Sequence, residues 1–455
     1  MIDTQAIRKR ILFLALNGQL VPQSSSDPCA CELVATLSEK LNGQAYRRSI
    51  AESEIPYRIP DSWEWCRLLD IGTTNIGLTY HPEDTSAQGT IVARSSNIIN
   101  GKMDYSDLVK VTCQIRDNQY LNRNDILICA RNGSKSLVGK CAIFEGISKT
   151  VAFGAFMAVF RTPLFRYVYY YFNTPVFKRN YISDDSKQIN QVTQSVLKQS
   201  LIPVPPLAEQ QRIVEKIEQA FSVLDTIDTL QAQYANNLTV LKSKLIDAAI
   251  QGKLTEQLPE DGTAEELYQQ IQAEKQSLSK VGKIKKEKPL PEIAAEEIPF
   301  VIPANWKWVR VGAVLTLQSG KNTTSSEIKP TLDEEHKIPC YGGNGLRGFV
   351  SQSNVEGFHA IIGRQGALCG NINFADGPFY ATEHAVVVYE YAGTNMIWAG
   401  ITLRCLNLNQ YATSVAQPGL AVNKINKILI PLPPLAEQKR IVDRLDKFLT
   451  ACNEF

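Results

Sequence analysis

This sequence of 455 residues lacks the usual motifs of catalysis. It has no GxSxG nucleophile turn, no GxxxxGK[S/T] phosphate loop and no Asn-Pro-Pro-Tyr element of the kind an amino-methyltransferase needs. Only four histidines occur, too few for a convincing metal site, and His384 beside Glu383 has no partnered nucleophile motif. We therefore predict a non-catalytic protein that holds no metal and no cofactor of its own.

Paired cysteines and long apolar runs are also scarce. The ten cysteines are scattered without a CxxC, and the closest pair is Cys29 and Cys31, so we expect reduced thiols that serve as small core residues. Basic residues 8–10 precede an apolar run at 11–16, but that run is short and no small-residue cleavage site follows it. No stretch approaches the length of a membrane span. These absences predict a cytoplasmic protein.

Neither charge is in excess. The chain has 48 Lys and Arg against 46 Asp and Glu, which gives a formal net charge of +2. Proteins that bind nucleic acid usually present a basic face. A DNA-binding surface on this chain would therefore be local, with acidic residues placed elsewhere.

Three stretches of the sequence occur twice. Residues 55–65 match 298–308, residues 201–214 match 429–442, and residues 7–20 match 241–254. The repeated piece is continuous from 207 to about 257, whereas its counterpart is split between 435–455 and about 1–23. This order is that of a circularly permuted two-fold repeat, so folding should bring Met1 and Phe455 close together.

The repeated piece has the pattern of a long helix. Pro205-Pro206 suit a helix start, and Glu209 would lie in the first turn, where the helix dipole favours a carboxylate. Apolar positions then recur at alternating spacings of four and three residues, which is the heptad pattern of a coiled coil. The positions predicted to pack helix against helix are Ile213, Ile217, Leu224, Ile227, Tyr234, Leu238, Leu241 and Leu245, with Ile7, Ile11, Leu14, Ile441, Leu445 and Phe448 in the split copy.

The predicted length of this helix is informative. From about Leu207 to Gln251 it would span roughly 65 Å at about 1.5 Å per residue, and Gly252 is the expected stop. That span is near two turns of B-DNA at about 34 Å each. Two such helices related by a pseudo-two-fold axis would pack antiparallel and could hold two DNA-reading domains a fixed distance apart.

Between the repeats lie two unlike segments with short apolar runs punctuated by glycine and asparagine, which predicts many short strands. We expect an α+β protein in which two globular domains are joined by two long antiparallel coiled-coil helices. The expected divisions are a helical arm at 1–49 that completes the second helical region, a first domain at 50–206, a central helix and linker at 207–297, a second domain at 298–434 and a C-terminal helix at 435–455. The lysine-rich stretch Lys280–Lys288 should be a solvated linker.

Two further motifs have structural explanations. Residues 343–348 fit GxGxxG, but Phe349-Val350-Ser351 does not open a helix, so we expect a glycine-rich turn between strands and no dinucleotide site. The pairs Trp63/Trp65 and Trp306/Trp308 have strand spacing and are expected to pack where each domain begins. Stacking on a base is the alternative for these tryptophans.

Polar clusters in the two unlike segments are the candidate DNA contacts. Arg, Lys, Asn and Gln can make paired hydrogen bonds to base edges, and serine hydroxyls or backbone amides can hold phosphates. The candidates are Arg94, Ser95, Asn97, Arg131, Asn132, Ser134, Lys135, Gln188, Asn190, Arg347, Arg364, Gln365, Thr382 and His384. An ordinary solvated loop remains the alternative for each of them.

The repeated motifs resemble one family. Pro-Pro-Leu-Ala-Glu-Gln at 205–210 and again at 433–438 leads into a helix, and each copy follows a segment that opens with Ile-Pro-x-x-Trp-x-Trp. This is similar to the specificity subunit of type I restriction-modification systems. The resemblance implies that each domain is a target-recognition domain for one half of a bipartite double-stranded DNA sequence, with the helices setting the spacer.

The resemblance also implies partners. Two methylation subunits would bind the specificity subunit, restriction subunits would join through the complex, and S-adenosylmethionine, ATP and Mg would be held by those partners. No motif carries individual base contacts over to this chain. The rival hypothesis is a coiled-coil scaffold that binds proteins and has no sequence preference for DNA.

Overall fold

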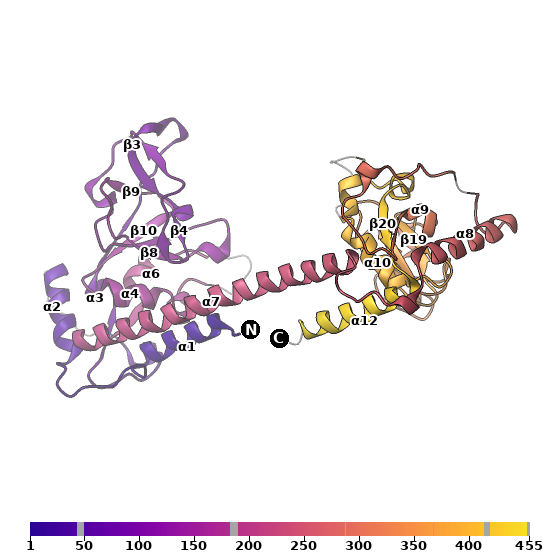
Figure 1. The fold of residues 1–455 in the computed structure, drawn as a ribbon. Coiled ribbons are helices and arrows are strands. Elements are labelled where there is room, and N and C mark those ends of the chain that lie inside the picture. Colours follow the sequence, from indigo (N-terminus) through magenta and orange to yellow (C-terminus); the bar gives the residue numbers. More distant parts are fainter. Residues whose placement is uncertain (43–49, 183–189, 287, 367, 414–418, 453–455) are drawn as a thin grey trace. The chain divides into compact units, whose positions relative to one another are not determined.

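The computed structural model describes residues 1–42, 50–182, 190–286, 288–366, 368–413 and 419–452. It divides into two compact units, Met1–Ala232 (unit 1) and Gln233–Phe455 (unit 2), each with its own hydrophobic core. Both units mix helices with short strands, so the expected α+β class with two domains is confirmed (Figure 1). Phe455, which was expected near Met1, lies outside the described residues.

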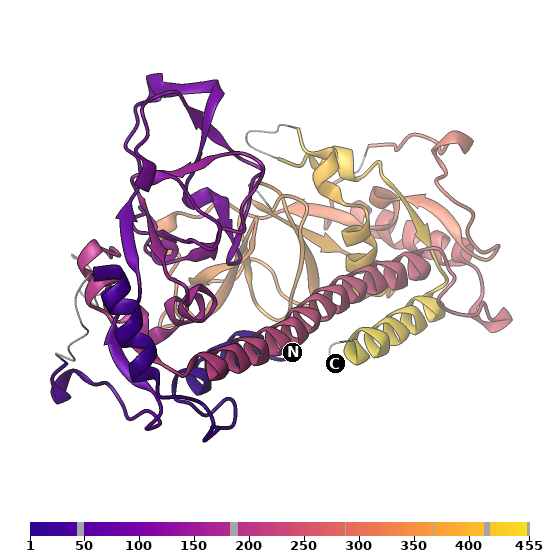
Figure 2. The same ribbon diagram turned by 90° about the vertical axis from the view of Figure 1, so that its left-hand side faces the viewer.

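Helix α7 (Leu207–Ile250) is the longest helix of the described residues, with 44 residues, and it is continuous in Figures 1 and 2. The prediction of one helix from about Leu207 to Gln251 is confirmed. It ends two residues before Gly252, whose φ of +70° is a left-handed conformation that favours glycine. The Lys253 amide donates to the Ala248 carbonyl at 2.8 Å and so satisfies one of the last carbonyls of the helix.

In unit 1, helix α1 (Thr4–Leu16) runs antiparallel to the first part of α7 (Figure 1). The Ile2 amide donates to the Gln231 side chain, and Arg8 forms ion pairs with Asp225 at 2.8 Å and Asp228 at 2.9 Å. Later residues of α1 therefore contact earlier residues of α7, as antiparallel helices do. These polar contacts fix where α1 lies along α7.

In unit 2, helix α12 (Leu435–Ala451) packs against the last turns of α7 (Figures 1 and 2). Ile441 and Leu445 are buried in the same cluster as Ala249, with Leu245 packed against it. Burial of apolar side chains on both helices supplies the main stabilisation of this contact.

The predicted helix-packing positions are only partly buried. Ile213, Ile217, Leu224, Ile441 and Leu445 are buried, and Ile11, Leu14, Ile227, Leu238 and Leu245 are intermediate. Ile7, Tyr234, Leu241 and Phe448 are exposed, so packing at these four positions is not seen. The reason is the shortness of α1 and α12: in the part of the chain that the structure describes, neither helix covers the middle turns of α7. On α1 the buried face also differs from the prediction, with Leu12, Ala15 and Leu16 inside.

Unit 1 contains three main strand groups. Its first pair is β1 (Glu64–Arg67) with β11 (Leu201–Val204), antiparallel. Its four-stranded sheet has the order β2 (Thr73–Ile76), β10 (Met157–Arg161), β7 (Ile126–Cys129) and β8 (Cys141–Ile143). Its three-stranded sheet has the order β6 (Val109–Val111), β3 (Thr85–Ala93) and β9 (Val151–Phe153), and a small hairpin joins β4 (Ile98–Ile99) to β5 (Lys102–Met103).

Unit 2 repeats this topology. Its first pair is β12 (Lys307–Arg310) with β20 (Leu429–Leu432). Its four-stranded sheet has the order β13 (Thr316–Ser319), β19 (Ala385–Tyr389), β16 (His359–Gly363) and β17 (Ile372–Ala375). Its three-stranded sheet has the order β15 (Gly345–Val350), β14 (Ile338–Gly342) and β18 (Tyr380–Ala381), with one parallel pair, β14 and β18, as β3 and β9 are in unit 1. The two domains therefore share one fold although their sequences differ.

Each unit contains further helices. They are α2 (Ala30–Asn42), α3 (Leu68–Ile71), α4 (Phe165–Phe172), α5 (Pro175–Lys178) and α6 (Gln194–Gln199) in unit 1, and α8 (Ala264–Lys280), α9 (Val311–Val314), α10 (Met396–Cys405) and α11 (Val422–Ile425) in unit 2. Helix α8 lies in the stretch expected to hold a linker. Its start is stabilised by a capping box between Thr263 and Glu266.

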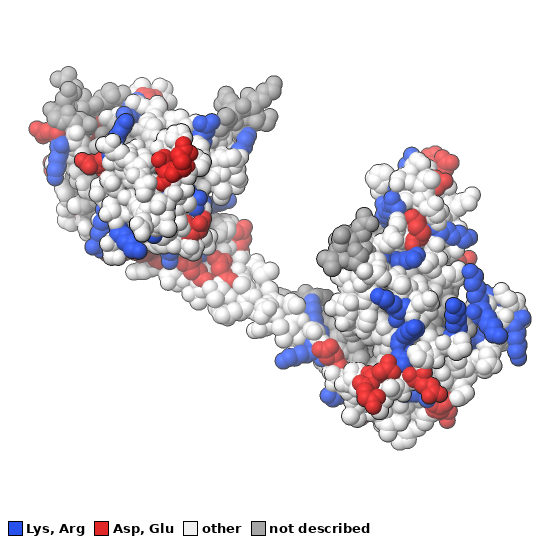
Figure 3. All heavy atoms as spheres, turned by 90° about the horizontal axis from the view of Figure 1, so that it is seen from above, with Lys and Arg blue, Asp and Glu red and all other residues white. Residues whose placement is uncertain are grey.

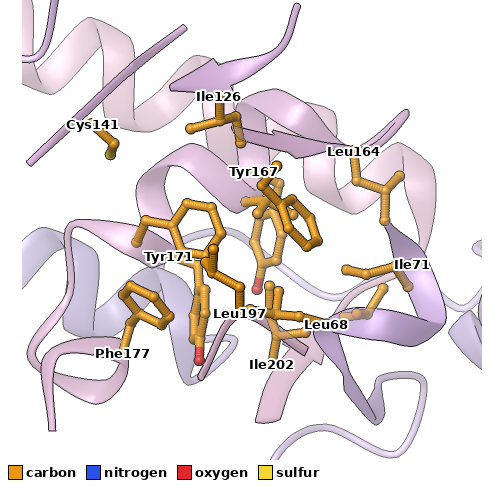
Figure 4. Close-up of a cluster of buried hydrophobic side chains, with 14 of the residues drawn as sticks. Leu68, Ile71, Ile126, Cys141, Leu164, Tyr167, Tyr171, Phe177, Leu197 and Ile202 are labelled. Atoms are coloured by element: carbon orange, nitrogen blue, oxygen red, sulfur yellow. The ribbon is translucent and has the colours of Figure 1, made fainter. Parts of the chain in front are cut away.

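Aromatic side chains of α4 anchor the core of unit 1. Figure 4 shows Tyr167 and Tyr171 among Leu68, Ile202 and their neighbours. Their hydroxyls donate to the carbonyls of Pro203 at 2.7 Å and Leu201 at 2.8 Å. Each ring thus fills the core while its polar end is satisfied by strand β11.

The structure also bears on the cysteines and on a possible membrane span. The sulfur atoms of Cys29 and Cys31 lie next to each other. Cys66, Cys129 and Cys141 are free and buried, as expected of small core residues. Within the described ranges, no helix is both long enough and apolar enough to cross a membrane.

Candidate nucleic-acid interface

The repeated tryptophans and glutamates form a buried lock in each unit. In unit 1 the Glu209 carboxylate accepts from Trp63 Nε1 at 3.0 Å and from Gln23 Nε2 at 2.7 Å. In unit 2 the Glu437 carboxylate accepts from Trp306 Nε1 at 2.8 Å and from Gln257 Nε2 at 2.8 Å. Both glutamates are buried. The lock therefore joins the start of each helix to the entrance of its domain.

Further contacts of the lock recur in both units. Arg212 pairs with Asp27 at 2.7 Å, and Arg440 donates to Asp261 at 2.6 Å. The glutamine after each of these glutamates bonds to the start of its own motif. The Gln210 side chain donates to the Pro205 carbonyl, and the Gln438 side chain donates to the Pro433 carbonyl. The Pro-Pro-Leu-Ala-Glu-Gln motif is thus explained by internal hydrogen bonds.

Burial and pairing shift the pKa of lock carboxyls in opposite directions. Burial raises the pKa of Glu209 above its usual value, although the Trp63 hydrogen bond opposes that shift. The Arg440 guanidinium lowers the pKa of Asp261. Trp63 and Trp306 are buried in these sites, which confirms for them the predicted packing where each domain begins. The candidate contacts with nucleic acid are therefore sought on the unlike parts of the domains.

In unit 1 the structure brings two of the predicted polar clusters together. Asn132 Nδ2 donates to Ser95 Oγ at 3.0 Å, and the Ser134 amide donates to Asn132 Oδ1 at 2.9 Å. Arg131 and Lys135 are exposed on the same loop. This loop, residues 131–135, forms a polar surface next to Ser95, suited to contact a phosphate backbone.

Other predicted residues of unit 1 are less accessible. Asn97 is buried and its amide donates to the carbonyls of Asp104 and Asp107, so it fixes a loop and has no donor left for a base. Arg94 pairs with Asp107 at 2.7 Å, and Asn190 is buried. Gln188 lies outside the described residues.

In unit 2 three predicted elements converge. The Arg364 amide donates to the His384 carbonyl at 2.8 Å, and the Thr382 amide donates to the Tyr341 carbonyl at 2.9 Å. A Cβ at Gly343 would collide with the Gln365 carbonyl. Glycine is therefore required where the turn after β14 approaches the loop after β16.

The glycine-rich stretch 343–348 lies on the hairpin of β14 and β15, as predicted, and opens no helix. Gln365 and Arg347 are exposed, and Arg347 donates to Ser325 Oγ at 3.2 Å. Arg364 is half-buried and donates to the Leu420 carbonyl. Thr382 is fully buried, which removes it from the accessible set. His384 remains partly exposed beside Glu383.

The surface charge is mixed, as the composition requires. Figure 3 shows many basic side chains on the face of unit 2 that it presents, with acidic side chains clustered at one end and others scattered over that face. Basic and acidic side chains are interspersed on unit 1 in the same view. Any attraction for DNA is therefore local and does not arise from net charge.

Sequence reasoning missed part of the lock. Gln23, Gln257, Asp27 and Asp261 were not singled out, yet each holds a repeated polar contact. Extending the repeat from 7–20 and 241–254 a few residues further along the sequence would have aligned these pairs.

Two domains of one topology, each closed by the same buried lock and each carrying its own polar loops, define a two-domain recognition protein. The model of the type I restriction modification DNA specificity domain family matches residues 60–234 and 303–455, more than half of the chain. The chain belongs to this family, as its repeated motifs suggested. It is a type I restriction-modification specificity subunit with two DNA specificity domains, and specificity subunits are non-catalytic recognition subunits.

Curated relatives agree with this assignment, and a solved structure shares the fold. The EcoprrI specificity subunit of Escherichia coli is 45% identical over 143 residues, which cover 31% of this chain and 36% of that protein. The EcoAI specificity subunit of Escherichia coli is 25% identical, and the match covers 98% of this chain and 89% of that protein. A chain from a structure on complex assembly and conformational transition of the type I R-M system has the same fold, with a TM-score of 0.63 at 17% identity over 88% of this chain and 93% of that chain.

Proposed function

We propose that this chain reads a bipartite, asymmetric sequence in double-stranded DNA. The domain of unit 1 reads one half of the target, the domain of unit 2 reads the other half, and the long helices set the length of the unread spacer. The two half-sites differ because the accessible loops differ, with Arg131 and Lys135 in one domain and Arg347 and Gln365 in the other.

One observation carries this proposal. Glu209 and Glu437 make the same buried contacts at the entrance of two domains that share one topology. The same buried contacts attach both domains to their helices, whereas the exposed loops of the two domains differ. A protein that binds two different half-sites in an equivalent way needs this combination. A general scaffold would have no need to repeat the domains as well as the helix starts.

The helical part supports a permuted repeat. Glu209 in α7 contacts Gln23, which follows α1, and Glu437 in α12 contacts Gln257, which follows α7. We infer that α12 and α1 together are the counterpart of α7, split by the chain ends, and that the two sets form an antiparallel pair along those of their apolar positions that are buried.

Partners follow from the same proposal. Two methylation subunits would bind the helical regions, and restriction subunits would join through that complex. S-adenosylmethionine, ATP and Mg would belong to those subunits. In unit 2 the exposed side chains of Tyr234, Val240 and Leu241 on α7 give such a partner apolar surface to bury.

Modified-base sequencing of DNA from the source organism tests the proposal. We expect one methylated motif made of two short sequences separated by a fixed unread spacer. Deletion of this gene should abolish that motif, and re-expression of the chain should restore it. Persistence of the motif after deletion, or loss of methylation only at a continuous motif, would contradict the proposal.

The rival scaffold hypothesis has a direct test as well. In an electrophoretic mobility-shift assay, the chain with its methylation subunits should bind a DNA that carries the motif at lower protein concentration than a DNA of scrambled sequence. The comparison is made at several salt concentrations. Equal binding of both DNAs at every salt concentration would favour the scaffold.

A further inference from the structure

One short turn occupies the same place in both domains. In unit 1, residues 154–156 connect β9 to β10, and in unit 2, residues 382–384 connect β18 to β19. Each turn leads from the three-stranded sheet into the four-stranded sheet of its domain. Its last residue is Phe156 in unit 1 and His384 in unit 2.

Backbone hydrogen bonds establish this equivalence. The Phe156 carbonyl accepts from the Ala130 amide at 2.9 Å, and the His384 carbonyl accepts from the Arg364 amide at 2.8 Å. The next residue closes the turn in each case, since the Met157 amide donates to Gly154 at 2.8 Å and the Ala385 amide donates to Thr382 at 2.9 Å.

The glycine that follows the edge strand of each four-stranded sheet, β2 or β13, confirms the match. The Gly77 amide donates to the Met157 carbonyl at 3.2 Å, and the Gly320 amide donates to the Ala385 carbonyl at 3.0 Å. At both glycines a Cβ would collide with the backbone of the turn region. The turn is therefore held in one place by the same close backbone packing in both domains.

The side chain at the end of the turn differs in chemistry and points outward. Phe156 is 63% exposed, although β9 and β10 on either side of it are almost entirely buried. The His384 side chain is 39% exposed, with Nε2 paired to Glu383 at 3.1 Å and Nδ1 buried. An exposed phenylalanine alone carries little meaning, but a fixed position whose two occupants differ in chemistry suits a reading function.

Polar neighbours make each position suitable for DNA. Arg131, whose amide also donates to the Phe156 carbonyl, is exposed beside it and can attract a phosphate. In unit 2 the corresponding residue is Gln365, which follows Arg364 as Arg131 follows Ala130. The Gln365 side chain is exposed. Each turn thus presents one variable side chain next to one polar or cationic side chain.

We propose that residue 156 in unit 1 and residue 384 in unit 2 are equivalent base-reading positions, which rests on the proposed function of the two domains. The Phe156 ring reads by apolar contact, for which the thymine methyl group is the matching feature of the major groove. The His384 imidazole reads by hydrogen bonding through Nε2, which exchanges Glu383 for a base because Nδ1 is buried. Purine N7 and guanine O6 are the matching acceptors. The two half-sites therefore differ at these positions because the two side chains do.

The test uses the chain in complex with its methylation subunits and a library of DNA targets, with methylation read by sequencing. Phe156→Ala should reduce discrimination at one base pair of one half-site by about fivefold or more and leave the other half-site unchanged. His384→Ala should do the same at one base pair of the opposite half-site. Ile147→Ala and Leu332→Ala, which remove other exposed apolar side chains from the two units, should leave the motif unchanged.

The outcomes separate this inference from the proposed function. If the wild type methylates a bipartite motif but Phe156→Ala and His384→Ala keep its stringency at every position, or lower methylation equally at all positions, the inference is wrong and the function stands. If the wild type shows no bipartite motif, both fail. Thermal unfolding of each variant checks that a change in specificity does not come from loss of folding, and an unchanged midpoint is expected because both side chains are exposed.

Discussion

Trp306 Nε1 donates to the Glu437 carboxylate at 2.8 Å, just as Trp63 Nε1 donates to Glu209 at 3.0 Å. Each bond joins a domain entrance to the start of a helix far away in sequence. Both carboxylates are buried. If either carboxylate were removed, water could not take its place as the acceptor for the N–H and O–H groups around it. These two bonds hold the two reading domains on their helices.

Removal of the Glu437 carboxylate should destabilise the chain. Glu437→Ala leaves the buried donors of Trp306 and Thr255 without an acceptor, and we expect a loss of about 3 kcal/mol in the free energy of unfolding. Urea denaturation at equilibrium measures it. Asp443→Ala, which removes an exposed carboxylate from the same helix, should change the value by less than about 0.5 kcal/mol. A loss of under about 1 kcal/mol for Glu437→Ala would show that the lock contributes little.

The Arg440–Asp261 pair gives a pH dependence of defined sign. The folded-state pKa of Asp261 lies below its usual value of 3.8 because Arg440 donates to the carboxylate. The pair therefore stabilises the fold fully above the unfolded pKa, and this contribution is lost as the pH falls through the depressed folded pKa.

Asp261→Asn tests that dependence. The difference in unfolding free energy between wild type and variant should be largest at about pH 6 and should shrink as the pH falls below 3.8. Denaturant titrations at several pH values measure the difference. A difference that stays constant down to about pH 2.5 would contradict the assignment.

Arg131 should act on DNA through charge. In the complex with methylation subunits, Arg131→Ala should weaken binding and make the slope of log affinity against log salt shallower by about one, since one phosphate contact is lost. Titrations of labelled DNA at several salt concentrations give the slope. Arg179→Ala removes an exposed arginine outside the predicted loops and should leave the slope unchanged. An unchanged slope for Arg131→Ala would place its guanidinium away from the phosphates.

Lengthening α7 should change the spacer and nothing else. Insertion of seven residues near Ala235 adds about 10.5 Å of helix, which corresponds to about three base pairs. Modified-base sequencing should find the same two half-sites with a longer gap. The same insertion after Gly282, beyond the end of α8, serves as the control and should leave the gap unchanged. An unaltered gap after the α7 insertion would remove the helix from the role of spacer.

Local signals in the sequence accounted for the long helix and the repeats. The spacing of apolar residues and the proline and glycine at its ends predicted α7 closely, because helix periodicity depends on neighbours within a few residues. The glycine turn at 343–348 followed from what comes after it in the sequence. The same reasoning could not give the shared sheet topology, since the parallel pairs β3·β9 and β14·β18 join strands far apart in the chain.

The candidate interface was predictable only in outline. Arg131, Gln365 and His384 lie on surface loops as expected, whereas Asn97 and Thr382 are buried within theirs. A polar residue type does not reveal whether its side chain satisfies a neighbouring backbone or faces solvent, because that depends on the folding of the loop. Phe156 was missed for the opposite reason, since an apolar residue between two apolar strands suggests core until the turn is placed.

Exchange of one domain tests most directly whether the two domains read separate halves of the target. Residues 298–434 should be replaced by the corresponding segment of another specificity subunit, and the motif methylated by the resulting complex should be determined by modified-base sequencing. We expect one half-site to change to that of the donor while the other half-site and the spacer length remain. A change in both half-sites, or in neither, would contradict the assignment of one half-site to each domain.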